Sequence, residues 1–227
     1  QFGKPVALTK DEIAELVKRW AIAAKACKDA GFSGVQIHAA HGYLISQFLS
    51  PLCNLRSDEY GGSLENRARF LLQVIVEVRK SVGFDFPISV KLNSADFQNG
   101  GFDFQDSLTL VQWLEAASVD LIEISGGSYE QPKLLGKEGL QPEEPQVMAP
   151  STAAREAYFV DFAQGMQAKV NVPLMVTGGF RKRSTMEHAL EIGAADVIGI
   201  GRPMCVMTNA PKQVLAGLEE LPRYEDQ

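Results

Sequence analysis

Short apolar runs alternate along this chain with longer segments of helical periodicity, and this rhythm limits the fold more than any other property of the sequence. The runs begin near residues 35, 88, 120, 172 and 196. Strands that alternate with helices form a parallel sheet joined by right-handed crossovers. Because the runs are apolar almost throughout, we expect both faces of the sheet to be covered.

Capping and turn residues locate the ends of the elements. A capping box formed by Thr9 and Glu12 opens the first helix and Gly31 ends it, while Ser63 opens the second helix and Gly83 stops it. The sequence predicts strands at 34–37, 87–93, 120–125, 172–176 and 196–200, and further helices around 110–114, over 153–168, over 184–192 and from 209 onward. We expect residues 126–150, with four prolines, to form a long functional or mobile loop in a single domain spanning 1–227.

Charge and composition bear on partners and compartment. The 227 residues carry a net charge of −6, so nothing electrostatic favours nucleic acid or an acidic membrane surface. No apolar run reaches membrane-spanning length, no signal peptide is visible, and the opening Gln1-Phe2 indicates a processed or truncated chain. The few, widely spaced cysteines argue against a disulfide framework and favour a reducing, cytoplasmic compartment: Cys27, Cys53 and Cys205.

Two of the three histidines, His38 and His41, stand where the first predicted strand ends, and Tyr43 follows them. Barrels of alternating strands and helices build their active sites at that end of the strands. Two imidazoles and a phenol there can donate hydrogen bonds to a substrate oxygen and supply a proton. The alternatives are histidines and a tyrosine that only pack, or a zinc site. No cysteine or acidic ligand stands at a familiar zinc spacing, so we expect no metal.

Lysine, glycine and arginine mark the ends of later strands. Lys91 ends a run of Ile, Val and Leu, where a lysine either has a partner or extends to solvent. Gly178-Gly179 and Gly201-Arg202 follow the last two strands. In barrels the loops after the last two strands frequently bind phosphate, because glycine lets backbone amides approach and arginine adds a charged fork. A Gly-Gly pair also serves ordinary tight turns, which is the alternative reading.

One long stretch carries a family resemblance. It consists of His38-Ala-Ala-His-Gly-Tyr-Leu44, then Gln47-Phe-Leu-Ser-Pro51, then Arg56-x-Asp-x-Tyr-Gly-Gly-Ser-x-x-Asn-Arg-x-Arg-Phe70. This pattern resembles the Old Yellow Enzyme family of FMN-dependent NAD(P)H:flavin oxidoreductases, or ene-reductases. The resemblance implies an α/β fold of the (β/α)8 TIM-barrel type, incomplete here, with five strands matching barrel strands four to eight. An open barrel exposes sheet edges, so we expect a homo-oligomer or pairing through those edges.

The resemblance also implies roles for individual residues. His38 and His41 bind the carbonyl or nitro oxygen of the substrate, although many members have asparagine at the second position, and Tyr43 donates the proton. Lys91 lies beside the N1–C2 carbonyl region of the flavin. The flavin phosphate contacts the loops that end the last two strands: Gly178, Gly179, Gly201 and Arg202. The charged segment 56–69 is interpreted as structural.

The implied activity is transfer of hydride from NAD(P)H through FMN to an activated alkene, such as an α,β-unsaturated carbonyl compound. Two other functions stay open at this point. The chain could be a truncated, non-catalytic barrel fragment that does not hold flavin. It could also be a phosphate-binding barrel lyase or isomerase in which Lys91 forms a Schiff base.

Overall fold

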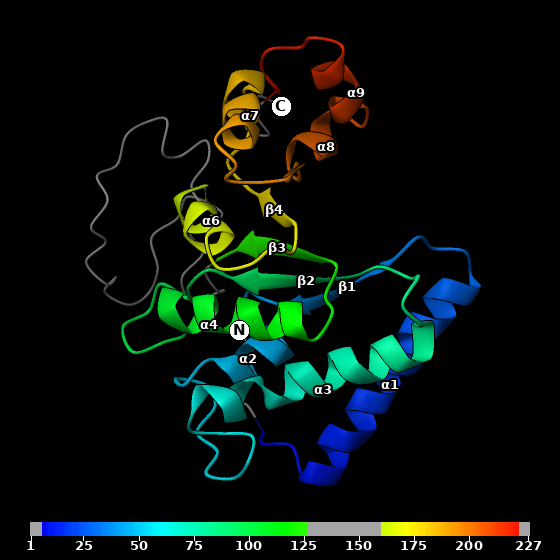
Figure 1. Ribbon diagram of the computed structural model, residues 1–227, viewed down its shortest axis with the longest axis vertical. Coiled ribbons are helices and arrows are strands. Elements are labelled where there is room, and N and C mark those ends of the chain that lie inside the picture. The colour runs from blue at the N-terminus through cyan, green and yellow to red at the C-terminus, as the bar shows by residue number, and fades with distance from the viewer. Residues whose placement is uncertain (1–5, 127–159, 223–227) are drawn as a thin grey trace.

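The computed structural model describes residues 6–126 and 160–222, which form a parallel sheet with helices between its strands (Figure 1). The sheet has five strands in the order β1-β2-β3-β4-β5. Every neighbouring pair is parallel. The strands are β1 (Val35–Ala39), β2 (Ile88–Asn93), β3 (Leu121–Ser125), β4 (Leu174–Thr177) and β5 (Val197–Gly199). The predicted sheet is confirmed, and each strand overlaps its predicted range.

Helices occupy the connections between the strands. They are α1 (Lys10–Asp29), α2 (Leu44–Leu49), α3 (Leu64–Val82), α4 (Phe104–Ala116), α6 (Val160–Gln167), α7 (Arg183–Glu191), α8 (Pro203–Val206) and α9 (Ala210–Leu215). Helices α1 and α3 pack against each other, and α4 contacts α6. The last three helices gather at one end of the molecule, beyond β4 (Figure 1).

The two helices whose starting caps were predicted, α1 and α3, begin at those residues. Thr9 and Glu12 form the reciprocal capping box of α1. Ser63 caps α3, and Gly83 follows its last residue with a positive φ of 79°. The sequence did not predict α2 and α8, because helices of six and four residues show no periodicity. Of the helix predicted over 153–168, the structure describes Val160–Gln167; the loop predicted over 126–150 lies outside the described residues except for Gly126.

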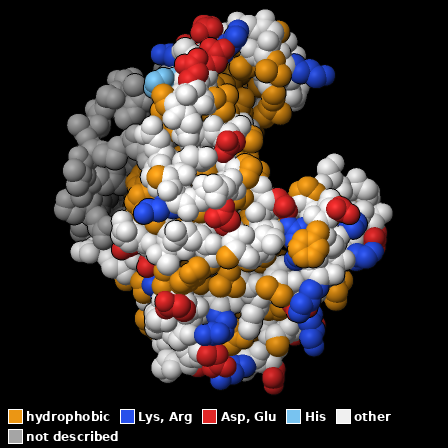
Figure 2. All heavy atoms as spheres, viewed as in Figure 1, with side chains coloured by type: hydrophobic (Ala, Val, Ile, Leu, Met, Phe, Trp, Pro, Cys, Tyr) orange, Lys and Arg blue, Asp and Glu red, His pale blue; other side chains and the backbone are white. Residues whose placement is uncertain are grey.

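The two faces of the sheet differ, which corrects the expectation that both are covered. The outer face is apolar and is buried from β1 to β4: Ile37, Ile88, Val90, Ile122, Ile124, Leu174 and Val176 are each at most 3% exposed. The inner face carries polar side chains, and its edges reach solvent: Gln36 and His38 are exposed, and Val197 is 41% exposed. Figure 2 shows the molecule hollowed between α8 and α9 on one side and the ends of α1 and α3 on the other. The inner face is therefore open.

A buried arginine joins the end of α3 to the start of two strands. Arg79 is 7% exposed and donates to the carbonyl oxygens of Gly83, Phe86 and Ser118. It also pairs with Asp120, whose carboxylate accepts a hydrogen bond from the first amide of β2. A buried charge is tolerated only when paired in this way.

Among the described residues, no helix is both long and apolar enough to cross a membrane.

Candidate active site

Three rings meet at the carboxyl end of β1. His38 is the fourth residue of that strand, and His41 and Tyr43 follow in the turn before α2. The ring centroids of His38 and His41 are 5.2 Å apart, and those of His38 and Tyr43 are 4.8 Å apart, both in edge-to-face arrangements. The structure thus brings together the three residues predicted to act on substrate.

The turn that carries His41 is fixed from β2. His41 has a φ of 62°, a left-handed conformation that is uncommon for a residue with a side chain. Its backbone N–H donates to Oδ1 of Asn93, and the Asn93 amide donates to Asp96 at 2.8 Å. Asn93 is 1% exposed and burial raises the pKa of the Asp96 carboxyl. This buried pair holds the histidine turn against the end of β2.

Both histidines are held in the neutral form. Burial, and after it the charge of Lys91, lower the pKa of His41 to about 4. His38 is an exposed residue, but partial desolvation of its ring, and after it the charge of Lys91, still lower its pKa, and the opposing effect of Glu123 is smaller. A neutral imidazole has one N–H donor and one acceptor. At neutral pH the pair can therefore donate hydrogen bonds without carrying charge.

Lys91 lies in the same row of the sheet as His38 and forms an ion pair that the sequence analysis did not predict. Its ammonium lies 2.7 Å from the carboxylate of Glu123, which is 5% exposed. Glu123 also accepts a hydrogen bond of 2.7 Å from Gln36 on β1. In the sheet register Lys91 pairs with His38 on one side and Glu123 on the other. The sequence did contain a signal for this ion pair. Glu123 is an acid inside an apolar run, and the preceding predicted strand contains Lys91.

The predicted phosphate residues lie at the same edge of the sheet, in the turns after β4 and β5, and β3 separates these two strands from β1 and β2. Gly178 and Gly179 follow β4 with φ values of 123° and 82°, conformations that side chains disfavour. Gly201 and Arg202 follow β5, whose last residue is in register with Thr177 of β4. The two glycine turns are therefore adjacent, and β2 and β3 lie between their strands and β1, which leads to the three-ring cluster.

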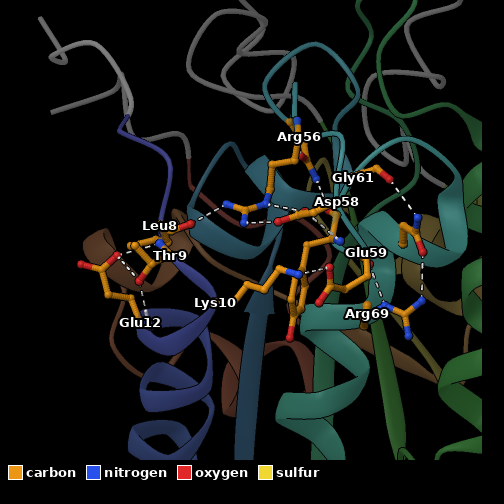
Figure 3. A network of polar contacts seen from close by, with 12 residues as sticks. Leu8, Thr9, Lys10, Glu12, Arg56, Asp58, Glu59, Gly61 and Arg69 are labelled. Carbon is orange, nitrogen blue, oxygen red and sulfur yellow. Dashed lines mark hydrogen bonds and ion pairs between the residues drawn. The ribbon is translucent and has the colours of Figure 1, made fainter.

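The segment 56–69 is tied to the start of α1 by charged groups (Figure 3). Arg56 lies 2.6 Å from Asp58 and donates to the carbonyl of Leu8 at 2.6 Å. The Arg56 guanidinium lowers the pKa of Asp58 to about 2. Lys10 pairs with Glu59 at 2.6 Å. These contacts support the interpretation of this segment as structural.

The groove on the outer side of the protein lies away from the cluster of His38, His41 and Tyr43. A groove of about 890 Å³ lies on the outer side, over α3 between α1 and α4. Its lining includes Val17, Leu72 and Trp113 and none of the predicted site residues. In the part of the chain that the structure describes, no three His, Cys, Asp or Glu side chains are placed to hold a metal ion.

The structure is an α/β protein whose candidate site residues lie where parallel strands end, the place where barrel enzymes build their active sites. The family profile described as NADH:flavin oxidoreductase / NADH oxidase matches residues 1–220. The chain belongs to this family.

Individual relatives agree with the family. The chain is 43% identical over 215 residues to an NADH-dependent flavin oxidoreductase, iliE, from Hypocrea jecorina, covering 94% of this chain and 52% of the relative. A solved structure of a 2-naphthoyl-CoA reductase with 2-naphthoyl-CoA superposes with a TM-score of 0.81 at 32% identity, covering 97% and 31% of the two chains. The Old Yellow Enzyme homologue from Zymomonas mobilis gives a TM-score of 0.73 at 27% identity, covering 96% and 56%.

Coverage explains the strand count. The chain spans about half the length of iliE from Hypocrea jecorina and of the Zymomonas mobilis protein. Its five parallel strands form an incomplete (β/α)8 barrel, as the sequence predicted. The open inner face follows directly, because a full barrel would enclose that face with its remaining strands.

Proposed function

We propose that the protein supplies the substrate side and part of the cofactor side of an FMN-dependent oxidoreductase that reduces activated alkenes with NAD(P)H. The observation that carries the proposal is the cluster of two neutral histidines and a tyrosine at the end of β1, one strand from the cation Lys91. The names of the relatives support the class of reaction. The preferred substrate is an α,β-unsaturated carbonyl or nitro compound.

The three rings have distinct tasks in this proposal. His38 and His41 donate hydrogen bonds to the substrate oxygen, which gains negative charge as hydride reaches the β-carbon. Fixed donors aimed at developing charge are an effective means of stabilising a transition state. Tyr43 delivers the proton to the α-carbon, since its phenolic O–H is a hydrogen-bond and proton donor.

The residues present fit FMN. When bound, the flavin accepts hydride from the nicotinamide and passes it to the alkene. Lys91 is a cation beside the histidines, as the anionic reduced cofactor requires, and Glu123 holds it in place. Gly178 and Gly179 form a turn that a Cβ would strain, where backbone amides can approach a phosphate.

Single-turnover kinetics test the proposal. The chain is loaded with FMN, reduced anaerobically by NADPH or NADH, and mixed with 2-cyclohexenone. Tyr43→Phe is expected to slow reoxidation by the enone roughly 10²-fold or more, and His41→Ala roughly 10²–10³-fold, because each removes a group used only in that half-reaction. Reduction by the nicotinamide should be unaffected by Tyr43→Phe.

The matched control is His188→Ala, which removes an exposed histidine on α7. Its reoxidation rate should equal that of the wild type. Enone reoxidation that is equally fast in Tyr43→Phe, His41→Ala and the wild type would contradict the assigned roles.

The open inner face favours one alternative, in which the chain alone is a non-catalytic part that does not retain flavin. Gln36 and His38 are exposed there. In the described sheet β1 and β5 are edge strands, and unpaired edges invite another chain. We therefore propose that pairing with a second chain, either a copy or a complementary segment, completes the barrel. The lyase alternative is less favoured, because the Lys91 nitrogen that would attack a carbonyl is engaged with the Glu123 carboxylate at 2.7 Å.

A reducing, cytoplasmic compartment remains part of the proposal. It is supported by the small number and wide spacing of the cysteines, Cys27, Cys53 and Cys205.

A further inference from the structure

The hydroxyl of Ser125, at the end of β3, contacts His41 across the sheet. Its Oγ lies 2.6 Å from Nε2 of His41, and Ser125 is 0% exposed. We propose that Ser125 donates its O–H to Nε2 of His41 and thereby keeps the imidazole proton on Nδ1, so that His41 presents an Nδ1–H donor to the substrate oxygen. Ser125 is then a positioning residue. This inference rests on the proposed function only in one respect, namely that the group accepting the Nδ1–H hydrogen bond is a substrate oxygen.

The direction of this hydrogen bond follows from the surroundings of the hydroxyl. A buried hydroxyl hydrogen needs an acceptor. If His41 donated from Nε2, the hydrogen of Ser125 would need a second acceptor. Within residues 6–126 and 160–222, Nε2 of His41 is the hydrogen-bond partner that the structure gives for this hydroxyl. The neighbouring Thr177 hydroxyl makes no hydrogen bond with it. Donation from Ser125 to Nε2 satisfies both groups.

The tautomer matters because His41 carries no charge at neutral pH, its pKa being about 4 through burial and the nearby Lys91. A neutral ring has a single N–H. With the proton on Nε2, Nδ1 would face the substrate with a lone pair. That lone pair would repel a carbonyl or nitro oxygen. With the proton on Nδ1, His41 becomes a donor. The serine thus selects substrates that offer an acceptor oxygen.

His38 shows the complementary arrangement. Its Nδ1 accepts a hydrogen bond of 3.2 Å from the backbone N–H of Ala40. Partial desolvation and Lys91 lower the pKa of His38 too, so that ring is also neutral and carries its proton on Nε2. Each histidine therefore has one nitrogen occupied by the protein: Nδ1 in His38 by a backbone amide, and Nε2 in His41 by Ser125. Each keeps its single N–H on the other nitrogen, which gives the pair two donors.

Nitrogen NMR of the histidine rings tests this assignment directly. The ¹⁵N-labelled chain is studied without FMN at pH 7.5, using long-range ring ¹H–¹⁵N correlations that distinguish a protonated nitrogen from a bare one. Signals of His41 are assigned by their loss in His41→Gln. The expected wild-type spectrum shows His41 protonated at Nδ1 and bare at Nε2. In Ser125→Ala we expect the major population to move to the Nε2–H form, which a free imidazole prefers in water.

The matched control is Ser94→Ala. Ser94 is also 0% exposed and follows the neighbouring strand, but its hydroxyl has no hydrogen-bond partner among the described residues. This variant should leave the His41 tautomer unchanged. An Nε2–H form in the wild type, an unchanged tautomer in Ser125→Ala, or the same change in Ser94→Ala would each overturn the proposal.

The wild-type spectrum alone decides the first of these outcomes, so the test stands even if Ser125→Ala does not fold. The measurement needs neither flavin nor turnover. A correct tautomer with no enone reduction would refute the proposed function and leave the role of Ser125 intact. Enone reduction by a protein whose His41 is protonated at Nε2 would refute the role of Ser125 and leave the proposed function intact.

Discussion

Replacing Lys91 by methionine should destabilise the protein by leaving Glu123 as an uncompensated buried charge. The two side chains are 19% and 6% exposed and lie 2.7 Å apart. Breaking one side of a buried ion pair costs about 3–5 kcal/mol, and the partial exposure of Lys91 places this pair at the lower end, about 3 kcal/mol. For a chain of this size, that corresponds to a melting temperature lower by roughly 6–12 °C.

The pH dependence of this loss follows from the pKa of Glu123. Burial is the largest single effect and raises that pKa, but the hydrogen bonds that the carboxylate accepts, among them those from Lys91 and Gln36, together with the charge of Lys91 outweigh burial, so in the folded protein the pKa lies below its ordinary value of 4.5. The stability that the pair contributes is therefore present above pH 4.5 and is lost as the pH falls below that value. In Lys91→Met burial acts without Lys91 and the pKa of Glu123 rises. As the pH falls, Glu123 in the folded variant takes up a proton and loses its charge. The loss in free energy of unfolding relative to the wild type is therefore largest at pH 7 and smaller at pH 5.

Urea unfolding monitored by circular dichroism at pH 7 and pH 5 measures both quantities. The control variants are Glu123→Gln and the double variant Lys91→Met/Glu123→Gln. Glu123→Gln should cost only about 1 kcal/mol, because the partly exposed ammonium of Lys91 can reach solvent. The double variant should be more stable than Lys91→Met, since it holds no buried charge. A cost below about 0.5 kcal/mol for Lys91→Met at pH 7, or a double variant no more stable than Lys91→Met, would refute this reasoning.

Two further variants test the scaffold. Arg79→Met should lower the free energy of unfolding by about 3 kcal/mol or more, because it leaves three carbonyl oxygens without their donor; Lys80→Met, an exposed neighbour on α3, should change it by less than about 0.5 kcal/mol. Equal effects in urea unfolding would contradict the role of Arg79. Thr9→Ala should cost about 1 kcal/mol by removing the cap of α1, and Thr9→Ser should restore most of it; a Thr9→Ser variant as unstable as Thr9→Ala would show that the cap is not responsible.

The sequence predicted the sheet well because its strands are short apolar runs that alternate with helical segments. Ile37, Val90, Ile122 and Val176 are buried in neighbouring strands, and each of the first four predicted strands contains one of them. The caps at Thr9 and Ser63 were recognisable because capping depends on residues only three positions apart. Local interactions of this kind can be read from sequence.

The contacts that organise the site were not predictable, because they join residues far apart in the chain. Glu123 meets Lys91 only through the register of β2 with β3, and that register is not written in either strand alone. Ser125 meets His41 from 84 positions away. The motif around His38 indicated which side chains act, but it could not indicate the groups that orient them.

The central claim is that the strand ends of this sheet hold FMN, with its phosphate at the turns after β4 and β5. The most direct measurement is the visible absorption spectrum of the purified chain after incubation with FMN and desalting, compared with the same treatment using riboflavin, which lacks the phosphate. We predict a retained yellow flavin spectrum with FMN and little or none with riboflavin. A colourless protein after FMN treatment, or equal retention of the two flavins, would contradict the claim.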